Sequence, residues 1–270
     1  MDATVSHCGK TRARDAFSLY ANEVGRYDVA IVTIAADAQR SHSLSLEPTP
    51  FIDCDHPAVR EFTGTHTQGV KTDLDKGVRL YYAVRDEIRY NPYDCDITRD
   101  GLKASATLER GNAFCVPKAI LLAACARAAG IPSRVAFADV RNHLNSEKLN
   151  DAMSGNDLFV FHGITILHLN GQWVKCTPAF NASLCEKTNT LPLEFDGLTD
   201  SLFHAFDAEG RKHMEYVHQR GEFDDLPYEE MLAAFREHYP DWTDRNLQDT
   251  RQNNGGAETF EAEAYSGDSD

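Results

Sequence analysis

The sequence predicts an α+β fold in which a helix packs against an antiparallel sheet. The helix is predicted over residues 115–129, which are rich in Ala and Leu, the strongest helix formers, and are followed by Gly130 and Pro132. The sheet is predicted from two β-rich runs on either side of Asn170-Gly171, because this dipeptide is the strongest short-range signal for a hairpin.

Length and composition indicate a globular protein. The 270 residues are 42% apolar and 26% charged, and this length fits one domain with extensions or two small domains. The 27 Lys and Arg against 42 Asp and Glu give a net charge of −15, which argues against nucleic acid and anionic membrane surfaces as partners. No apolar run approaches the ~18 residues of a membrane span, and the N-terminus is polar, so a cytoplasmic location is expected.

The cysteines predict reduced thiols rather than a disulfide framework or a metal site. They form no CxxC pair and no Cys/His spacing typical of structural zinc, so no cofactor and no metal are expected. The seven positions are Cys8, Cys54, Cys95, Cys115, Cys125, Cys176 and Cys185.

The part of the chain before the central helix contains one clear element. Residues 72–90 carry apolar residues at helical spacing and begin with residues that can cap a helix. Residues 27–36 fit either a strand or a short helix. The prolines of residues 46–57 predict an extended or looped segment, and residues 94–113 predict a loop.

The middle of the chain alternates helix and strands. The helix of residues 115–129 has Pro117 in its first turn, where the missing N–H costs little. Residues 134–140 predict a strand. The hairpin strands are residues 158–169 and 172–177, joined by a two-residue loop.

The remaining segments are mostly irregular. Residues 142–156 are polar and predict a loop, and residues 181–207 predict irregular structure. Residues 227–239 predict an amphipathic helix. Residues 241–270 are polar, with no Lys or Arg after Arg251, and predict a disordered acidic tail.

These elements divide the chain into four parts. We expect an N-terminal extension over residues 1–60 and a core domain over residues 61–185. A C-terminal extension over residues 186–240 would pack on the core, and the tail of residues 241–270 would follow. The central helix and the hairpin both fall in the core domain.

Cys115 is the candidate nucleophile because it begins the strongest helix of the chain. Only the thiolate of a cysteine attacks, and a free thiol with a pKa of about 8.5 is mostly protonated at neutral pH. The unpaired N–H groups and the macrodipole of a helix N-terminus favour the anion. The same N–H groups are suited to an oxyanion hole. Most cysteines are simply small buried residues, so this assignment needs a base nearby.

His162 is the candidate base, and Thr177 is its expected neighbour. A two-residue loop at Asn170-Gly171 pairs Ile164 with Thr177, so His162 and Thr177 share a face of the hairpin as diagonal neighbours. A catalytic imidazole needs an acceptor for its second N–H, which sets its tautomer and orientation. Thr177 is the polar residue placed to provide that acceptor.

Two segments form a pair that resembles a known family. They are GNAFCVPKAILLAACARAAGIPSRV (residues 111–135) and FHGITILHLNGQWVKCTPAFN (residues 161–181). Together they resemble the cysteine and histidine motifs of the transglutaminase-like superfamily, a branch of the papain-like cysteine enzymes, although Gly111 stands further before the cysteine than the family's glycine. The resemblance covers roughly residues 70–185, and residues 186–240 more weakly resemble the C-terminal extension of bacterial and fungal members.

The resemblance implies a papain/transglutaminase-like core and a catalytic triad with one departure. It implies Cys115 as nucleophile and His162 as base and acid, with Thr177 at the position where the family usually has Asp. Threonine accepts a hydrogen bond but carries no charge, whereas papain-like enzymes function with a neutral Asn. Three consequences stay open: a weaker thiolate–imidazolium pair, another acceptor such as Asp139 or Asp157, or lost activity.

The favoured hypothesis is a cysteine hydrolase or acyltransferase. Cys115 would attack an amide or other acyl carbon of a peptide, a protein or a small molecule, and water or an amine would resolve the acyl-enzyme. Amide hydrolysis, deamidation and transamidation share every step before the acceptor. The alternative is a non-catalytic binding module in which Thr177 marks a degenerate triad, and a metal-binding or purely structural protein is a third reading. The sequence leaves the oligomeric state open.

Overall fold

The structure, a computed structural model, describes residues 44–93, 95–143, 149, 153, 155–203, 209–211 and 213–247. By its contacts the chain divides into two units, Met1–Leu44 and Ser45–Asp270. All the elements below belong to the second unit. The predictions for residues 27–36 and for the tail beyond residue 247 lie outside the described residues, as does most of the predicted loop of residues 142–156.

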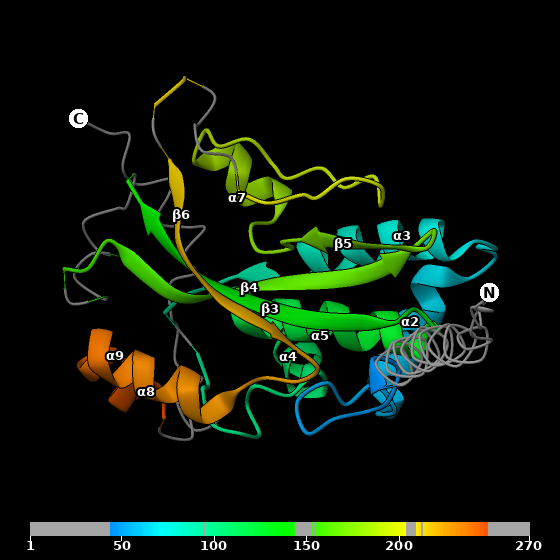
Figure 1. The fold of residues 1–270 in the computed structure, drawn as a ribbon, viewed down its shortest axis with the longest axis horizontal. Coiled ribbons are helices and arrows are strands. Elements are labelled where there is room, and N and C mark those ends of the chain that lie inside the picture. Colours follow the sequence, from blue (N-terminus) through cyan, green and yellow to red (C-terminus); the bar gives the residue numbers. More distant parts are fainter. Residues whose placement is uncertain are drawn as a thin grey trace, which may run out of the picture. The chain divides into compact units, whose positions relative to one another are not determined.

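A four-stranded antiparallel sheet forms the centre of the second unit (Figure 1). Its strand order is β5-β4-β3-β6, so the hairpin β4–β5 lies on one side of β3 and the late strand β6 on the other. The strands are β3 (Ser133–Asn142), β4 (Leu158–Leu169), β5 (Gln172–Cys176) and β6 (Met214–Phe223). A short parallel pair, β1 (Arg89–Tyr90) and β2 (Asn112–Ala113), lies outside this sheet.

Helix α5 packs against the sheet, as the sequence predicts, and in Figure 1 the strands cross in front of it. Three further helices, α2, α3 and α4, pack around α5. The helices are α2 (Pro57–Thr67), α3 (Asp73–Glu87), α4 (Ala104–Arg110), α5 (Cys115–Ala128), α7 (Ala182–Lys187), α8 (Tyr228–His238) and α9 (Pro240–Asn246). None of the helices in the described part of the chain has the length and apolar character needed to cross a bilayer.

Helix α5 is enclosed on all sides, which explains its composition. Every residue from Val116 to Arg127 is buried. A helix that is apolar all round is typical of a central element, and its many alanines allow neighbouring elements to approach closely. Gly130 follows the helix with φ 82°, the left-handed conformation that favours glycine at this position.

The β4–β5 hairpin has the predicted register. Asn170 and Gly171 have φ 48° and 80°, as a type I′ turn requires. Leu169 pairs with Gln172, and the ladder continues outward to the pair of Thr165 and Cys176. The strand and turn residues of this hairpin therefore contain enough local information to fix its geometry.

Several elements depart from the sequence predictions. The predicted loop of residues 94–113 contains α4 and β2, and the predicted tail begins with α9. Helix α4 depends on a distant partner, because Asp53 accepts hydrogen bonds from both the backbone N–H and the hydroxyl of Ser105 in its first turn. Helix α7 interrupts the irregular segment of residues 181–207, and α2 and β6 have no counterpart among the predicted elements.

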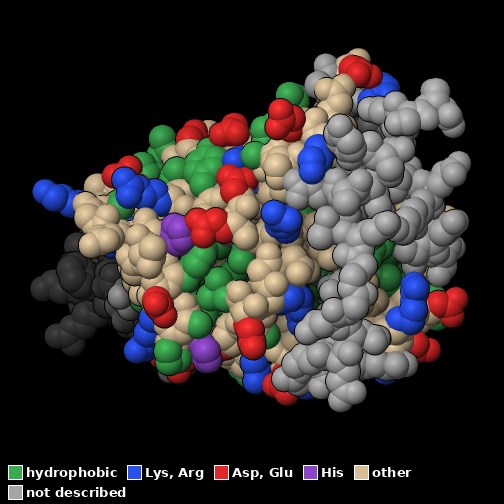
Figure 2. All heavy atoms as spheres, turned by 180° about the vertical axis from the view of Figure 1, so that it is seen from behind, with side chains coloured by type: hydrophobic (Ala, Val, Ile, Leu, Met, Phe, Trp, Pro, Cys, Tyr) green, Lys and Arg blue, Asp and Glu red, His purple; other side chains and the backbone are tan. Residues whose placement is uncertain are grey.

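The described surface carries charges of both signs. On the face shown in Figure 2, acidic and basic side chains are interspersed, with apolar surface between them.

Candidate active site

Cys115 is the first residue of α5 and is partly exposed. Burial of its sulfur raises the pKa of the Cys115 thiol to about 11. The backbone N–H groups of Gly163, Val116 and Cys115 itself act in the opposite direction, because each favours the thiolate. Two of these donors belong to the helix N-terminus, as expected, and the third comes from β4.

Gly163 allows β4 to lie directly against the start of α5. A Cβ atom at this position would lie 2.9 Å from the carbonyl oxygen of Cys115 and 2.9 Å from the Cα of Val116. Both are backbone atoms, so a larger residue could be accommodated only if the helix moved away from the strand. The main chain directly after His162 therefore touches the main chain of the candidate nucleophile.

His162 lies on the other face of the sheet from α5, because side chains alternate along a strand and Gly163 faces the helix. It pairs with Ala138 of β3 and is 3% exposed. Burial lowers the pKa of His162 to about 3. Its Nε2 atom has no hydrogen-bond partner among the described residues.

Thr177 follows β5 and is held by its backbone. Its N–H donates to the carbonyl of Ser201 at 3.0 Å, and its carbonyl accepts from the hydroxyl of Tyr81 at 3.3 Å. Its side-chain oxygen is buried and, like Nε2 of His162, has no hydrogen-bond partner among the described residues. The expected hydrogen bond between Thr177 and His162 is therefore not formed in this structure.

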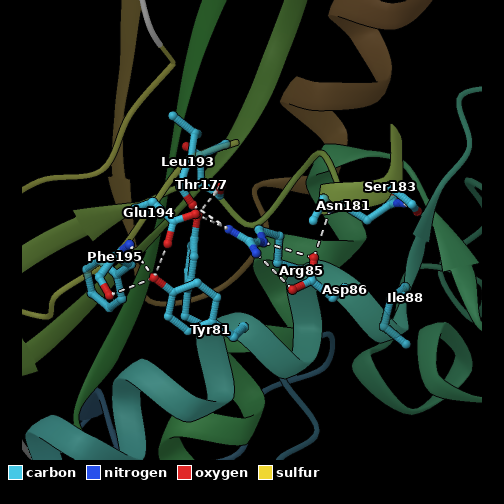
Figure 3. A network of polar contacts seen from close by, with 12 residues as sticks. Tyr81, Arg85, Asp86, Ile88, Thr177, Asn181, Ser183, Leu193, Glu194 and Phe195 are labelled. Atoms are coloured by element: carbon cyan, nitrogen blue, oxygen red, sulfur yellow. Dashed lines mark hydrogen bonds and ion pairs between the residues drawn. The ribbon is translucent and has the colours of Figure 1, made fainter. Parts of the chain in front are cut away.

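A network of hydrogen bonds and an ion pair connects the segments after β5 to helix α3 (Figure 3). The Tyr81 hydroxyl and the Arg85 guanidinium both donate to the carbonyl of Leu193 at 2.8 Å. Arg85 also pairs with Asp86 at 2.9 Å, and Asp86 accepts from the N–H of Ala182 at 2.9 Å. The backbone position of residue 177 thus depends on α3 as well as on the sheet.

Neither of the other acceptors considered from the sequence forms a hydrogen bond with Nε2 of His162. Asp139 is buried and binds the guanidinium of Arg220, and it also accepts from the N–H of Phe161 at 3.1 Å. Asp157 pairs with Arg141 at 3.2 Å. Both carboxylates are therefore engaged with other groups.

Tyr216 of β6 is a site residue that the sequence analysis missed. Its hydroxyl accepts from the N–H of Phe203 at 3.3 Å. Burial raises the pKa of Tyr216 to about 12; the Phe203 N–H opposes this rise, and a thiolate at Cys115 adds to it. The phenol therefore lies among the candidate residues. No local motif marks it, because pairing of β6 with β3 brings it there.

Comparison with known proteins identifies the central segment. Residues 60–178 match the sequence model of the transglutaminase-like superfamily. A comparison with curated proteins gives no match.

Two solved structures are similar at low identity. A candidate cysteine protease from Cytophaga hutchinsonii is 14% identical, with a TM-score of 0.39, over 66% of this chain and 52% of its own. A candidate protease from Parabacteroides distasonis is 18% identical, with a TM-score of 0.31, over 43% of this chain and 22% of its own. The chain thus spans about half the length of the first protein, 52%, and a smaller share of the second.

Proposed function

Residues 60–178 belong to the transglutaminase-like superfamily, and from this premise we propose that the protein is a cysteine-dependent acyl-transfer enzyme. Cys115 is its nucleophile and His162 its base and acid, acting on an amide or other acyl group of a peptide, a protein or a small molecule. The observation that carries the proposal is the backbone N–H of Gly163, which favours a thiolate at Cys115 from the position next to His162. What supports the pairing of thiol and base is that the main chain next to His162 touches the start of α5, where Cys115 stands.

The resting site favours a neutral thiol and a neutral imidazole over a preformed ion pair. Burial holds the pKa of Cys115 at about 11 and that of His162 at about 3, so the proton stays on sulfur before attack. As the sulfur bonds to the acyl carbon, the proton passes to His162, which then gives it to the leaving amine. Water or an amine resolves the thioester with His162 again as base. The N–H groups of Val116 and Gly163 are suited to stabilise the oxyanion.

The acyl-enzyme provides the test. With p-nitrophenyl acetate as acyl donor, mass spectrometry should find one acetyl group on Cys115, and His162→Gln should slow acetylation about 10²- to 10⁴-fold, the usual range for a general base. The acetylation rate should rise with pH above neutrality, because the raised pKa of the thiol means that the thiolate fraction still increases there. His168→Gln, the same change further along β4, should leave the rate unchanged. Equal acetylation of Cys115 in wild type and His162→Gln would contradict the proposal.

A binding module is the second candidate, favoured by the unpaired side chains of His162 and Thr177. A module of this kind would bind a peptide at these residues without bond cleavage. No acetyl group would then accumulate on Cys115 above the level on the buried Cys125, and Cys115→Ala would bind peptide as well as wild type.

A further inference from the structure

The imidazole of His162 is held by aromatic packing. The ring of Phe203 lies 4.6 Å from it, centroid to centroid, with the two planes inclined by 36°. The ring of Tyr216 lies 6.2 Å away in an edge-on arrangement. Since Nε2 makes no hydrogen bond with the described residues, packing against these two rings is suited to set the orientation of the base.

Phe203 is itself fixed from both sides. Its backbone N–H donates to the Tyr216 hydroxyl at 3.3 Å, and its ring lies 5.1 Å from that of Phe180. Two residues earlier, Ser201 exchanges backbone hydrogen bonds with the end of β5, donating to Lys175 at 2.8 Å and accepting from Thr177 at 3.0 Å. The segment before Phe203 is therefore attached to β5 through Ser201, and the Tyr216 hydroxyl binds the backbone of Phe203 at the end of that segment.

The spacing between Tyr216 and His162 is set by the sheet. Tyr216 pairs with Val140 of β3, and His162 pairs with Ala138 of the same strand. Phenol and imidazole thus stand on strands either side of β3, and the register of both ladders shifts between Ala138 and Val140. Tyr216 therefore binds the segment that carries Phe203 from a position within the sheet.

We propose that Tyr216 is a positioning residue for His162. Its hydroxyl binds the backbone of Phe203, and the ring of Phe203 packs against the imidazole and fixes its plane. These contacts take the role of the carboxylate that the family usually has at the position of Thr177. The pair of Phe203 and Tyr216 is called the aromatic clamp below. This inference rests on the proposed function, in which the orientation of His162 decides how well it takes the proton of Cys115.

The test removes only the hydroxyl. Tyr216→Phe keeps the ring and should slow acetylation of Cys115 by p-nitrophenyl acetate about tenfold, because a mispositioned base loses rate steeply. It should also change the nitrogen-15 NMR signals of the His162 ring, assigned by their loss in His162→Gln. Phe203→Leu should have the same two effects, whereas Phe203→Tyr, which keeps the ring, should retain the wild-type rate and signals.

Tyr82→Phe is the matched control. The Tyr82 hydroxyl accepts from the backbone N–H of Phe195 at 3.0 Å, the same kind of bond as that between Tyr216 and Phe203. Its loss should leave the acetylation rate and the His162 signals unchanged.

The outcomes separate the clamp from the proposed function. Wild-type rate and unchanged His162 signals in Tyr216→Phe would overturn the clamp, and so would faster acetylation, since Phe203 would then act as a cover over the base. If wild type forms no acyl-enzyme that depends on His162, the proposed function fails. The ring signals then still decide whether Tyr216 fixes the imidazole.

Discussion

At the scale of single residues, the close approach of β4 to α5 depends on the absence of a side chain at Gly163. The atoms that a Cβ would meet belong to the backbone of Cys115 and Val116, and backbone cannot rotate away as a side chain can. The hydroxyl of Thr165, two residues along the same face, donates to the carbonyl of Ala119 at 2.9 Å and holds the helix at this distance. Residue 163 therefore affects both stability and the position of the nucleophile.

Gly163→Ala should destabilise the protein by about 1–3 kcal/mol, the usual cost of overpacking, and should slow acetylation of Cys115. Urea denaturation followed by circular dichroism measures the first effect. The control is Gly64→Ala inside α2, where a Cβ would meet nothing within 4 Å, and it should stabilise by about 0.5–1 kcal/mol. If Gly163→Ala were as stable as wild type, the contact between strand and helix would be looser than the structure has it.

The candidate residues were chosen from sequence motifs, but no motif marks their neighbours. Cys115, His162 and Thr177 stand in motifs whose helix start, turn and strand alternation are local. Tyr216 and Phe203 come from segments without a motif, and their place depends on the pairing of β6 with β3. The missing hydrogen bond of Thr177 was also beyond prediction, because it depends on the exact positions of two side chains.

At the scale of elements, a buried lysine joins the nucleophile helix to the end of α3. Lys118 of α5 donates to the carbonyls of Ile88 and of Arg85, the latter at 2.9 Å. These carbonyls belong to the last turn of α3 and its C-cap, which have no partner within the helix. Burial lowers the pKa of Lys118 to about 7, because removing the charged ammonium from water costs free energy.

Lys118→Met should destabilise the protein by about 1–3 kcal/mol, because it keeps the apolar stem and leaves two buried carbonyls without a donor. Thermal or urea unfolding would measure the change. Lys76→Met is the control: Lys76 pairs with the exposed Asp73 on the surface of α3, and its loss should cost no more than about 0.5 kcal/mol. A similar loss in both variants would mean that the capping of α3 by Lys118 contributes nothing specific.

The elements that the sequence predicts are those whose structure is determined by nearby residues. The hairpin has its Asn-Gly turn, and α5 has its composition and its Gly130 stop. Strand β6 is largely polar and exposed, with Gly221 at φ 116°, so its strand character comes from hydrogen bonds to β3. Helix α2 contains three threonines and a glycine, which weaken its helical signal, and it forms against α5.

At the scale of the second unit, its last described helices reach the start of α5. The Trp242 ring of α9 lies 5.9 Å from that of Phe114, the N-cap of α5, and 5.5 Å from that of Phe235 in α8. Its Nε1 donates to the carbonyl of Pro92 at 3.0 Å. The N–H of Cys95 donates to Asn246 at 3.1 Å. Segments far apart in sequence thus meet beside the candidate site.

Trp242→Ala should cost about 3–5 kcal/mol, as for other large aromatic residues removed from a core. Urea unfolding should show one shifted transition by both circular dichroism and fluorescence if α9 unfolds together with the sheet. The chain's other tryptophan is the control: Trp173 is 36% exposed on the hairpin, and its replacement by Ala should cost about 1 kcal/mol. A separate early transition in Trp242→Ala would show that α8 and α9 fold independently.

The contact at Gly163 also has a consequence for protein design. Because the separation of the two elements is set where main chain meets main chain, it does not depend on which side chains stand at positions 115 and 162. If serine or selenocysteine replaced Cys115, or another base replaced His162, the spacing between β4 and α5 would stay the same. New pairs of nucleophile and base could therefore be designed where β4 meets α5, provided that Gly163 is kept.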